Sequence, residues 1–236
     1  MGKTFYFIEM SNFDLTENEF FTSQQLTLDS TKKDADPLTY LKIVDANFYK
    51  GYMRLEGLHE SIDKTPRRLA GDLEYLTQSI VGGDKPFDCY FNPDNNILIM
   101  NTSKHNVIGL QRRLIKNFPK TFVPQQGELD FKYLLNNLSN SRIIGSWFNN
   151  IQGKVNAIGL FGERVNLDDI FKYYNDLGKL SAITVEWLLE DVDQPLNIMF
   201  TKKFGVVLNS TWDKKNDLDF LIKIQPLLFE PETSIL

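Results

Sequence analysis

Five basic residues lie within the stretch 104–120, KHNVIGLQRRLIKNFPK, which contains no acidic residue. They are Lys104, Arg112, Arg113, Lys116 and Lys120. Clustered ammonium and guanidinium groups are the side chains that bind the phosphates of nucleic acids. The stretch therefore predicts a phosphate-binding surface, in a chain whose net charge is −5.

The same stretch predicts a helix that begins after Ser103 and ends before Pro119. At about 100° per residue, Arg112, Arg113 and Lys116 fall within an arc of about 100°. The apolar residues of the stretch form a second arc, which we expect to face the core. These apolar residues are Val107, Ile108, Leu110, Leu114, Ile115 and Phe118. The alternative interpretation is an ordinary solvated face whose cations favour the C-terminal end of the helix dipole.

A second basic group, Lys64, Arg67 and Arg68, lies at the start of another predicted helix. Thr65 is the predicted cap of this helix, Pro66 occupies its first turn, and the glycines at 82–83 end it. Positive charge at this end opposes the helix dipole and favours a bound anion. From residue 64 to 120 nine basic residues stand against five acidic ones, a local balance of +4, which leaves −9 for the rest of the chain. We expect nucleic-acid contacts from Lys64, Arg67, Arg68, Lys104, Arg112, Arg113, Lys116 and Lys120.

The composition limits the other possibilities. With 42% hydrophobic and 13% aromatic residues, the chain can build a real core. The single cysteine, Cys89, excludes an intramolecular disulfide and is typical of a reducing compartment. Its strand-like context, FDCYF, predicts a structural role. The chain shows neither a signal-peptide pattern nor an apolar run of about 18 residues, so we expect a cytoplasmic protein that does not insert into a membrane.

Motifs for catalysis are missing from the sequence. It has no Walker-type loop and no nucleophile elbow, and two histidines with one cysteine leave little for a zinc site. We expect no cofactor, no metal and no catalytic residue. The alternative is a Mg²⁺-dependent nuclease built from acids near the end of one strand and lysines on the next. Its candidate residues are Glu186, Glu190, Asp191, Asp193, Lys202 and Lys203.

Hydrophobic periodicity predicts an α+β protein with two domains, mostly antiparallel sheets and packed helices. The segment 123–127, VPQQG, is the predicted linker, so the domains are 1–124, which contains the basic helix, and 125–236, which contains an antiparallel sheet. The predicted strands are 3–10, 48–58, 87–91, 97–102, 142–148, 154–161, 181–189, 196–200 and 206–208. Besides the two helices above, we expect helices over 130–140, from a cap at Asn166 to Gly178, and over 217–224, where a strand is the alternative.

The order of these elements resembles the family of the A protein of the Rex phage-exclusion system, and bacterial proteins encoded near defence genes. The likeness covers residues 64–189 and rests on the helix from Arg67, the hairpin FDCYF to ILIMN, and the following helix. It continues through RIIGSWF, GKVNAIGLFGE and AITVEWLL, with a strand ending in Phe161-Gly162 before an acid. The resemblance implies a homodimer that binds DNA without strong sequence preference and acts in abortive infection with a membrane partner encoded in the same operon. The other interpretation left open is a protein-interaction or sensor subunit of a defence system.

Overall fold

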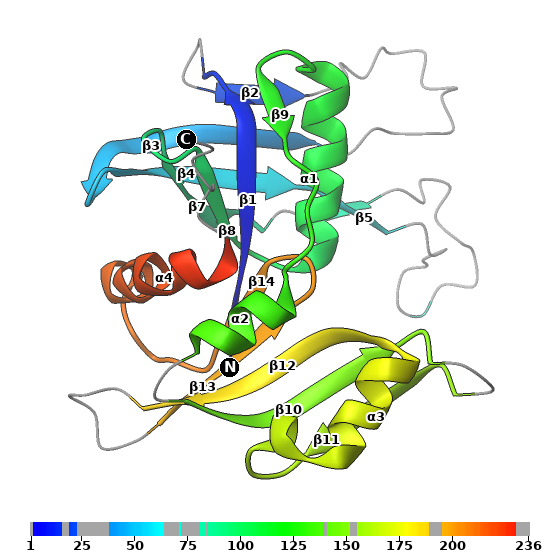
Figure 1. Cartoon of the computed structure of the whole chain (residues 1–236). Helices are drawn as coiled ribbons and strands as arrows, with labels where there is room; N and C mark the ends of the chain where they lie inside the picture. The colour runs from blue at the N-terminus through cyan, green and yellow to red at the C-terminus, as the bar shows by residue number, and fades with distance from the viewer. Residues whose placement is uncertain are drawn as a thin grey trace, which may run out of the picture. The chain divides into compact units, whose positions relative to one another are not determined.

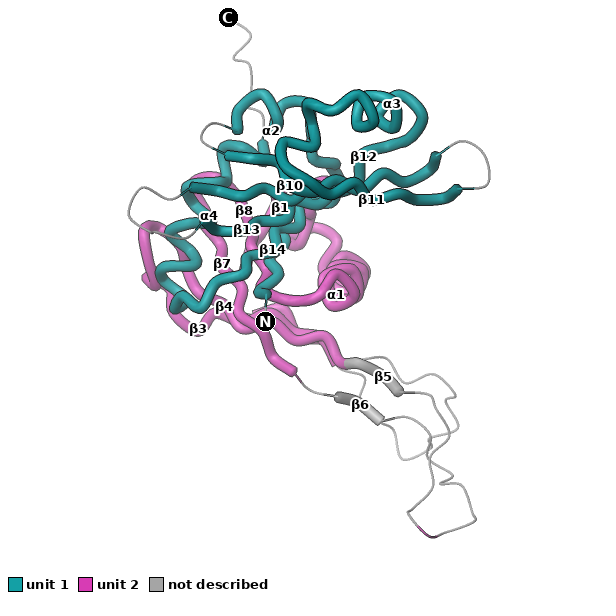
Figure 2. The backbone as a smooth tube through the Cα atoms, turned by 90° about the horizontal axis from the view of Figure 1, so that it is seen from below, with its two compact units in different colours: residues 1–7, 126–236 teal, residues 8–125 magenta. Residues whose placement is uncertain are grey.

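The structure is a computed structural model that describes residues 2–15, 19–22, 38–63, 71, 81–83, 85–138, 141–151, 155–188 and 195–229. The chain forms two compact units (Figure 2). Residues 8–125 form the N-terminal unit, and residues 1–7 with 126–236 form the C-terminal unit. The division after residue 125 lies close to the predicted boundary, but the first residues of the chain group with the C-terminal unit. That the units are separate domains stays a prediction.

In the N-terminal unit the strand order is β1-β8-β7-β4-β3-β2, and β9 also pairs with β1. The described pairs β2–β3, β3–β4, β4–β7, β7–β8 and β1–β9 are antiparallel. The bounds are β1 Lys3–Phe13, β2 Glu19–Thr22, β3 Thr39–Tyr49, β4 Tyr52–His59, β7 Phe87–Asn92, β8 Ile97–Asn101 and β9 Phe122–Pro124. A separate antiparallel pair joins β5 Ser61–Asp63 to β6 Val81–Gly83. The helix α1 spans Lys104–Asn117 (Figure 1).

Aromatic rings fill the core of this unit. The ring of Phe13 lies 4.2 Å from that of Phe91 and 6.0 Å from that of Phe122, measured between centroids. Phe20 adds edge contacts to Phe122 at 5.6 Å and to Phe118 at 5.0 Å. Such offset and edge-to-face pairs stabilise a core beyond the area they bury.

In the C-terminal unit the strand order is β11-β10-β12-β13-β14-β1, where β1 contributes its residues up to Phe7, and the described pairs are antiparallel. The strands are β10 Ser141–Asn149, β11 Ala157–Phe161, β12 Lys179–Trp187, β13 Leu196–Thr201 and β14 Gly205–Leu208. The helices are α2 Phe131–Asn137, α3 Asp169–Leu177 and α4 Lys214–Leu228, with a 3-10 turn η1 at Val165–Leu167.

The helices of the C-terminal unit pack through a few large side chains. Phe171 of α3 meets Phe148 of β10 with 5.3 Å between ring centroids, and Phe220 of α4 lies 6.0 Å from Trp187. Asp217 of α4 is only 3% exposed and forms an ion pair with Lys3 at 2.5 Å. A buried carboxylate requires such a partner, so this pair ties the first strand to the last helix.

The α+β class and the antiparallel pairing are confirmed within the described residues. The hairpin at 87–101, a helix within the predicted range 130–140, the strands β10 and β11 and the end of α3 at Gly178 also agree with the sequence-based predictions. The segment 217–224 is helical, as part of α4.

Four predictions are wrong in detail. The predicted strand 48–58 is two strands, because Lys50 and Gly51 have φ values of 46° and 79° and form a tight turn. The first part of the predicted linker is β9, which pairs with β1. The glycines at 82–83, which were predicted to end a helix, lie in β6. The cap of α3 is Asp168, whose side chain accepts a hydrogen bond from the backbone N–H of Ile170, in place of Asn166.

The predicted helix that follows Thr65 lies outside the described residues except for Gly71, which is a turn residue with a φ of 88°. Among the helices that the structure does describe, none is both long enough and apolar enough to span a bilayer.

Candidate nucleic-acid interface

The predicted basic helix is α1, and both of its ends follow from the sequence. The side chain of Ser103 accepts a hydrogen bond from the backbone N–H of Asn106 at 3.3 Å, which satisfies a free donor of the first turn. The helix ends at Asn117, where Phe118 leaves the helical conformation before Pro119. The ring of Phe118 packs on Phe20 of β2. Because both ends of α1 are defined, the positions of its exposed side chains along the helix are defined too.

Three aliphatic side chains fix α1 to the N-terminal unit. Val107, Leu110 and Leu114 are buried, and the helix contacts β2, β3, β4 and β9 (Figure 1). At Gly109 an added Cβ would lie 2.1 Å from Nε2 of His59, a residue of β4. Because no side chain fits there, glycine permits the close approach of the helix to the strand.

His59 is held between the strand and the helix. Its Nδ1 lies 2.8 Å from the hydroxyl oxygen of Thr39, and its ring centroid is 6.4 Å from that of His105. Burial lowers the pKa of His59, the electrostatic influence of His105 and Arg113 lowers it further, and Glu60 opposes this. His59 is therefore neutral at pH 7, and its ring packs against α1.

The exposed face of α1 differs from the predicted one. Lys104, Arg112 and Lys116 are exposed, but Ile108 and Ile115 share their side of the helix and are 45% and 41% exposed. These five residues span an arc of about 120° at 100° per residue. The expectation that both isoleucines face the core is wrong, because the buried arc is narrow and centred on Val107, Leu110 and Leu114. We call the exposed positions 104, 108, 112, 115 and 116 the outer face of α1.

Arg113 occupies a different position from its two basic neighbours. It is half-buried, and its charge acts on His59 at the inner flank of the helix. Lys120 is exposed in the turn after α1, where its backbone carbonyl accepts a hydrogen bond from the Asn12 side chain at 2.7 Å. Lys64, Arg67 and Arg68 lie outside the described residues, so the structure does not place them.

The exposed cations of this region differ from those on the neighbouring strands. Lys42 pairs with Glu56 at 2.9 Å, and Arg54 pairs with Asp88 at 2.8 Å. By contrast, the basic side chains of the outer face and of Lys120 form no ion pair with any residue that the structure describes. Their charges are available to an external anion.

The two isoleucines of the outer face are the residues that sequence reasoning misplaced. The signal that would have found them is the spacing of positions 107, 110 and 114, which alone defines one narrow buried stripe at helical period. Positions 108 and 115 lie about 100° from the centre of that stripe or farther.

Of the four acids proposed for a nuclease, the structure describes only Glu186. Glu186 pairs with Arg142, while Lys202 and Lys203 pair with Glu128 at 2.8 and 3.0 Å. Glu190, Asp191 and Asp193 lie outside the described residues. Within the part of the chain that is described, no group of three or more histidine, cysteine, aspartate or glutamate side chains is arranged to hold a metal ion.

Cys89 is buried in β7, and burial raises the pKa of its thiol. A buried thiol with a raised pKa is a poor nucleophile, which agrees with the predicted structural role.

Two comparisons of the sequence with known proteins gave no match. No protein-family model matches the chain, and no curated protein is similar enough in sequence to count as a relative. The functional interpretation therefore rests on the geometry of the outer face and on the resemblance described above.

Proposed function

We propose that the protein binds nucleic acid through the outer face of α1, without catalysing a reaction on it. The observation that supports this proposal is a row of exposed cations on a capped helix, free of ion pairs to described residues. These cations are Lys104, Arg112 and Lys116, with Lys120 in the turn that follows.

The spacing of the cations suits a phosphate backbone. At 1.5 Å per residue, Lys104 and Arg112 are about 12 Å apart along the helix axis, and Lys116 lies about 6 Å farther on. A duplex strand presents one phosphate per roughly 3.4 Å of its axis, so the row spans several phosphates. Phosphate contacts set position and affinity but carry no sequence information. Binding without sequence preference is therefore expected.

The resemblance to the Rex A family makes DNA the preferred nucleic acid and abortive infection the preferred setting. It also suggests a homodimer and a partner protein from the same operon, which is membrane-bound in that system. These parts of the proposal depend on the resemblance, and the biophysical test below does not require them.

The test is fluorescence anisotropy with a labelled 30-base-pair DNA duplex and the whole chain. Arg112→Gln with Lys116→Gln should weaken binding by about tenfold or more, because two charge-assisted contacts are lost. Lys85→Gln with Lys179→Gln removes the same net charge from two exposed positions elsewhere and should leave affinity nearly unchanged. Arg113 is kept because it is half-buried beside His59. Equal losses in the two double variants would contradict a local site.

A second candidate function is recognition of an acidic protein, and Ile108 with Ile115 favours it. Two exposed isoleucines among cations are suited to an amphipathic acidic partner and contribute nothing to phosphate contacts.

The variant Ile108→Gln with Ile115→Gln separates the two functions. Both side chains are exposed and glutamine is the better helix former, so α1 should remain folded. We expect the DNA affinity of this variant to stay within about twofold of the wild type. A large loss of DNA binding, with an unchanged circular dichroism spectrum, would contradict a phosphate-only contact and favour a partner that uses the apolar part of the face.

A further inference from the structure

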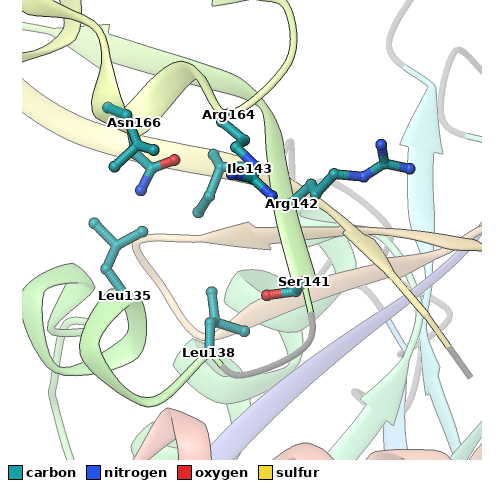
Figure 3. Close-up of a pocket in the computed structure, with 8 residues that line it drawn as sticks. Leu135, Leu138, Ser141, Arg142, Ile143, Arg164 and Asn166 are labelled. Carbon is teal, nitrogen blue, oxygen red and sulfur yellow. The ribbon is translucent and has the colours of Figure 1, made fainter.

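A pocket of about 230 Å³ opens in the C-terminal unit, between α2, the start of β10 and the turn η1 (Figure 3). The volume lies somewhat below the roughly 300 Å³ at which pockets for drug-sized ligands begin, so a small ligand fits it. One side of the pocket is aliphatic, with Leu135 and Leu138, and the other side is polar. The polar lining is made by Ser141, Arg142, Arg164 and Asn166.

The charges of the lining define the kind of ligand. Two arginines are among the residues that line the pocket, and no acidic residue is. Glu186 pairs with Arg142 and neutralises it, and in Figure 3 the guanidinium of Arg142 extends away from the aliphatic side chains. Arg164 keeps its full charge, since it forms no ion pair with any described residue. The pocket therefore has one cation in excess.

Hydrogen-bonding groups converge on the same space. Figure 3 shows the hydroxyl of Ser141 and the amide of Asn166 directed toward the space between them and the leucines, with Arg164 reaching down beside Ile143. The side chains of Ser141, Arg164 and Asn166 form no hydrogen bond to another residue in the described part of the chain. Their donors are available to a ligand.

The backbone of Arg164 has an uncommon conformation. Arg164 has φ 49° and ψ 45°, the left-handed conformation, which is uncommon for a residue other than glycine. Residues held in this conformation cluster at ligand sites. The turn places the start of the arginine side chain above the pocket.

We propose that this pocket binds a small organic carboxylate with a compact apolar body. The planar carboxylate would pair with the guanidinium of Arg164 and accept hydrogen bonds from Ser141 and Asn166, while the apolar body lies against Leu135 and Leu138. The guanidinium of Arg164, which has no ion-pair partner among the described residues, can balance one negative charge. The aliphatic side chains of the lining disfavour an ion that keeps its full shell of water. This site is independent of the outer face of α1, since all of its residues belong to the C-terminal unit.

The experiment is an NMR titration of the isotope-labelled whole chain with 3-phenylpropionate. We expect saturable shifts at the amides of residues 141–143 and 164–167. The neutral analogue 3-phenylpropan-1-ol lacks the carboxylate, and the short ion propionate lacks the apolar ring. Each should therefore bind at least about tenfold more weakly than 3-phenylpropionate. Saturation by the alcohol at the same concentration, or no saturable shift at these amides, would overturn the proposal.

A variant adds a second readout. Arg164→Asn removes the cation and keeps a residue type that tolerates the left-handed conformation, so the turn should persist. Its affinity for 3-phenylpropionate should fall by about tenfold or more, whereas Lys172→Gln, an exposed cation of the same unit, should bind as the wild type does. Unchanged affinity of Arg164→Asn would exclude the proposed contact, and the wild-type titration remains decisive if that variant does not fold.

Discussion

The residues of the basic helix α1 differ in how deeply they are buried, and this difference decides which of them can contact a ligand. Arg113 is half-buried beside His59, whereas Arg112, one position earlier, is exposed. A rotation of about 100° thus separates a residue that supports the fold from one that can meet a ligand. From the sequence alone the two arginines are equivalent, because the sequence does not show on which side of the helix the neighbouring strand packs.

His59 makes stability depend on pH in a predictable direction. Its pKa in the folded protein lies below its ordinary value, so the unfolded chain takes up the proton first as the pH falls. The contribution of His59 should therefore be constant above about pH 7 and become destabilising as the pH falls through about 6.5 toward the folded pKa.

Urea midpoints measured from pH 8 to pH 5 check this expectation, with His59→Gln as the comparison. The decrease in the wild type between pH 7 and pH 5.5 should exceed that of the variant. Parallel pH profiles for the two proteins would show that His59 does not titrate as described.

At the scale of the element, the close contact between α1 and β4 depends on Gly109. Alanine is favoured over glycine within a helix by about 1 kcal/mol, yet its Cβ would lie 2.1 Å from Nε2 of His59. The ring is held by Thr39, so we expect Gly109→Ala to destabilise the protein by about 1–3 kcal/mol in urea denaturation. The second substitution His59→Ala should recover part of this loss, and additive losses in the double variant would contradict the contact.

Elements with local signals were predictable from the sequence. The hairpin from FDCYF to ILIMN, which is β7–β8, and the limits of α1 at Ser103 and Pro119 were predictable because turn and cap chemistry acts over a few residues. The Lys50-Gly51 turn was missed because lysine is an unusual residue at positive φ. The strand β9 was missed because its pairing with β1 is a contact between residues far apart in the chain. The pocket combines α2, β10 and η1, and no sequence spacing indicates that combination.

At the scale of the whole molecule, charge is unevenly distributed along an acidic chain. The stretch 64–120 has a balance of +4, and the remainder has −9. A chain of this kind should be repelled by nucleic acid except at a local surface, so binding should involve only the few phosphates that this surface contacts and should weaken as the salt concentration rises. The outer face of α1 is a described surface that meets this requirement.

The salt dependence of DNA affinity tests this central claim most directly. The slope of log association constant against log salt concentration changes by about 0.9 for each phosphate contact. Measured by anisotropy between 50 and 200 mM NaCl, the slope for Arg112→Gln with Lys116→Gln should be smaller in magnitude than that of the wild type by about 1.8. The control Lys85→Gln with Lys179→Gln should keep the wild-type slope. Wild-type binding with no salt dependence, or the same slope in all three proteins, would contradict nucleic-acid binding through this helix.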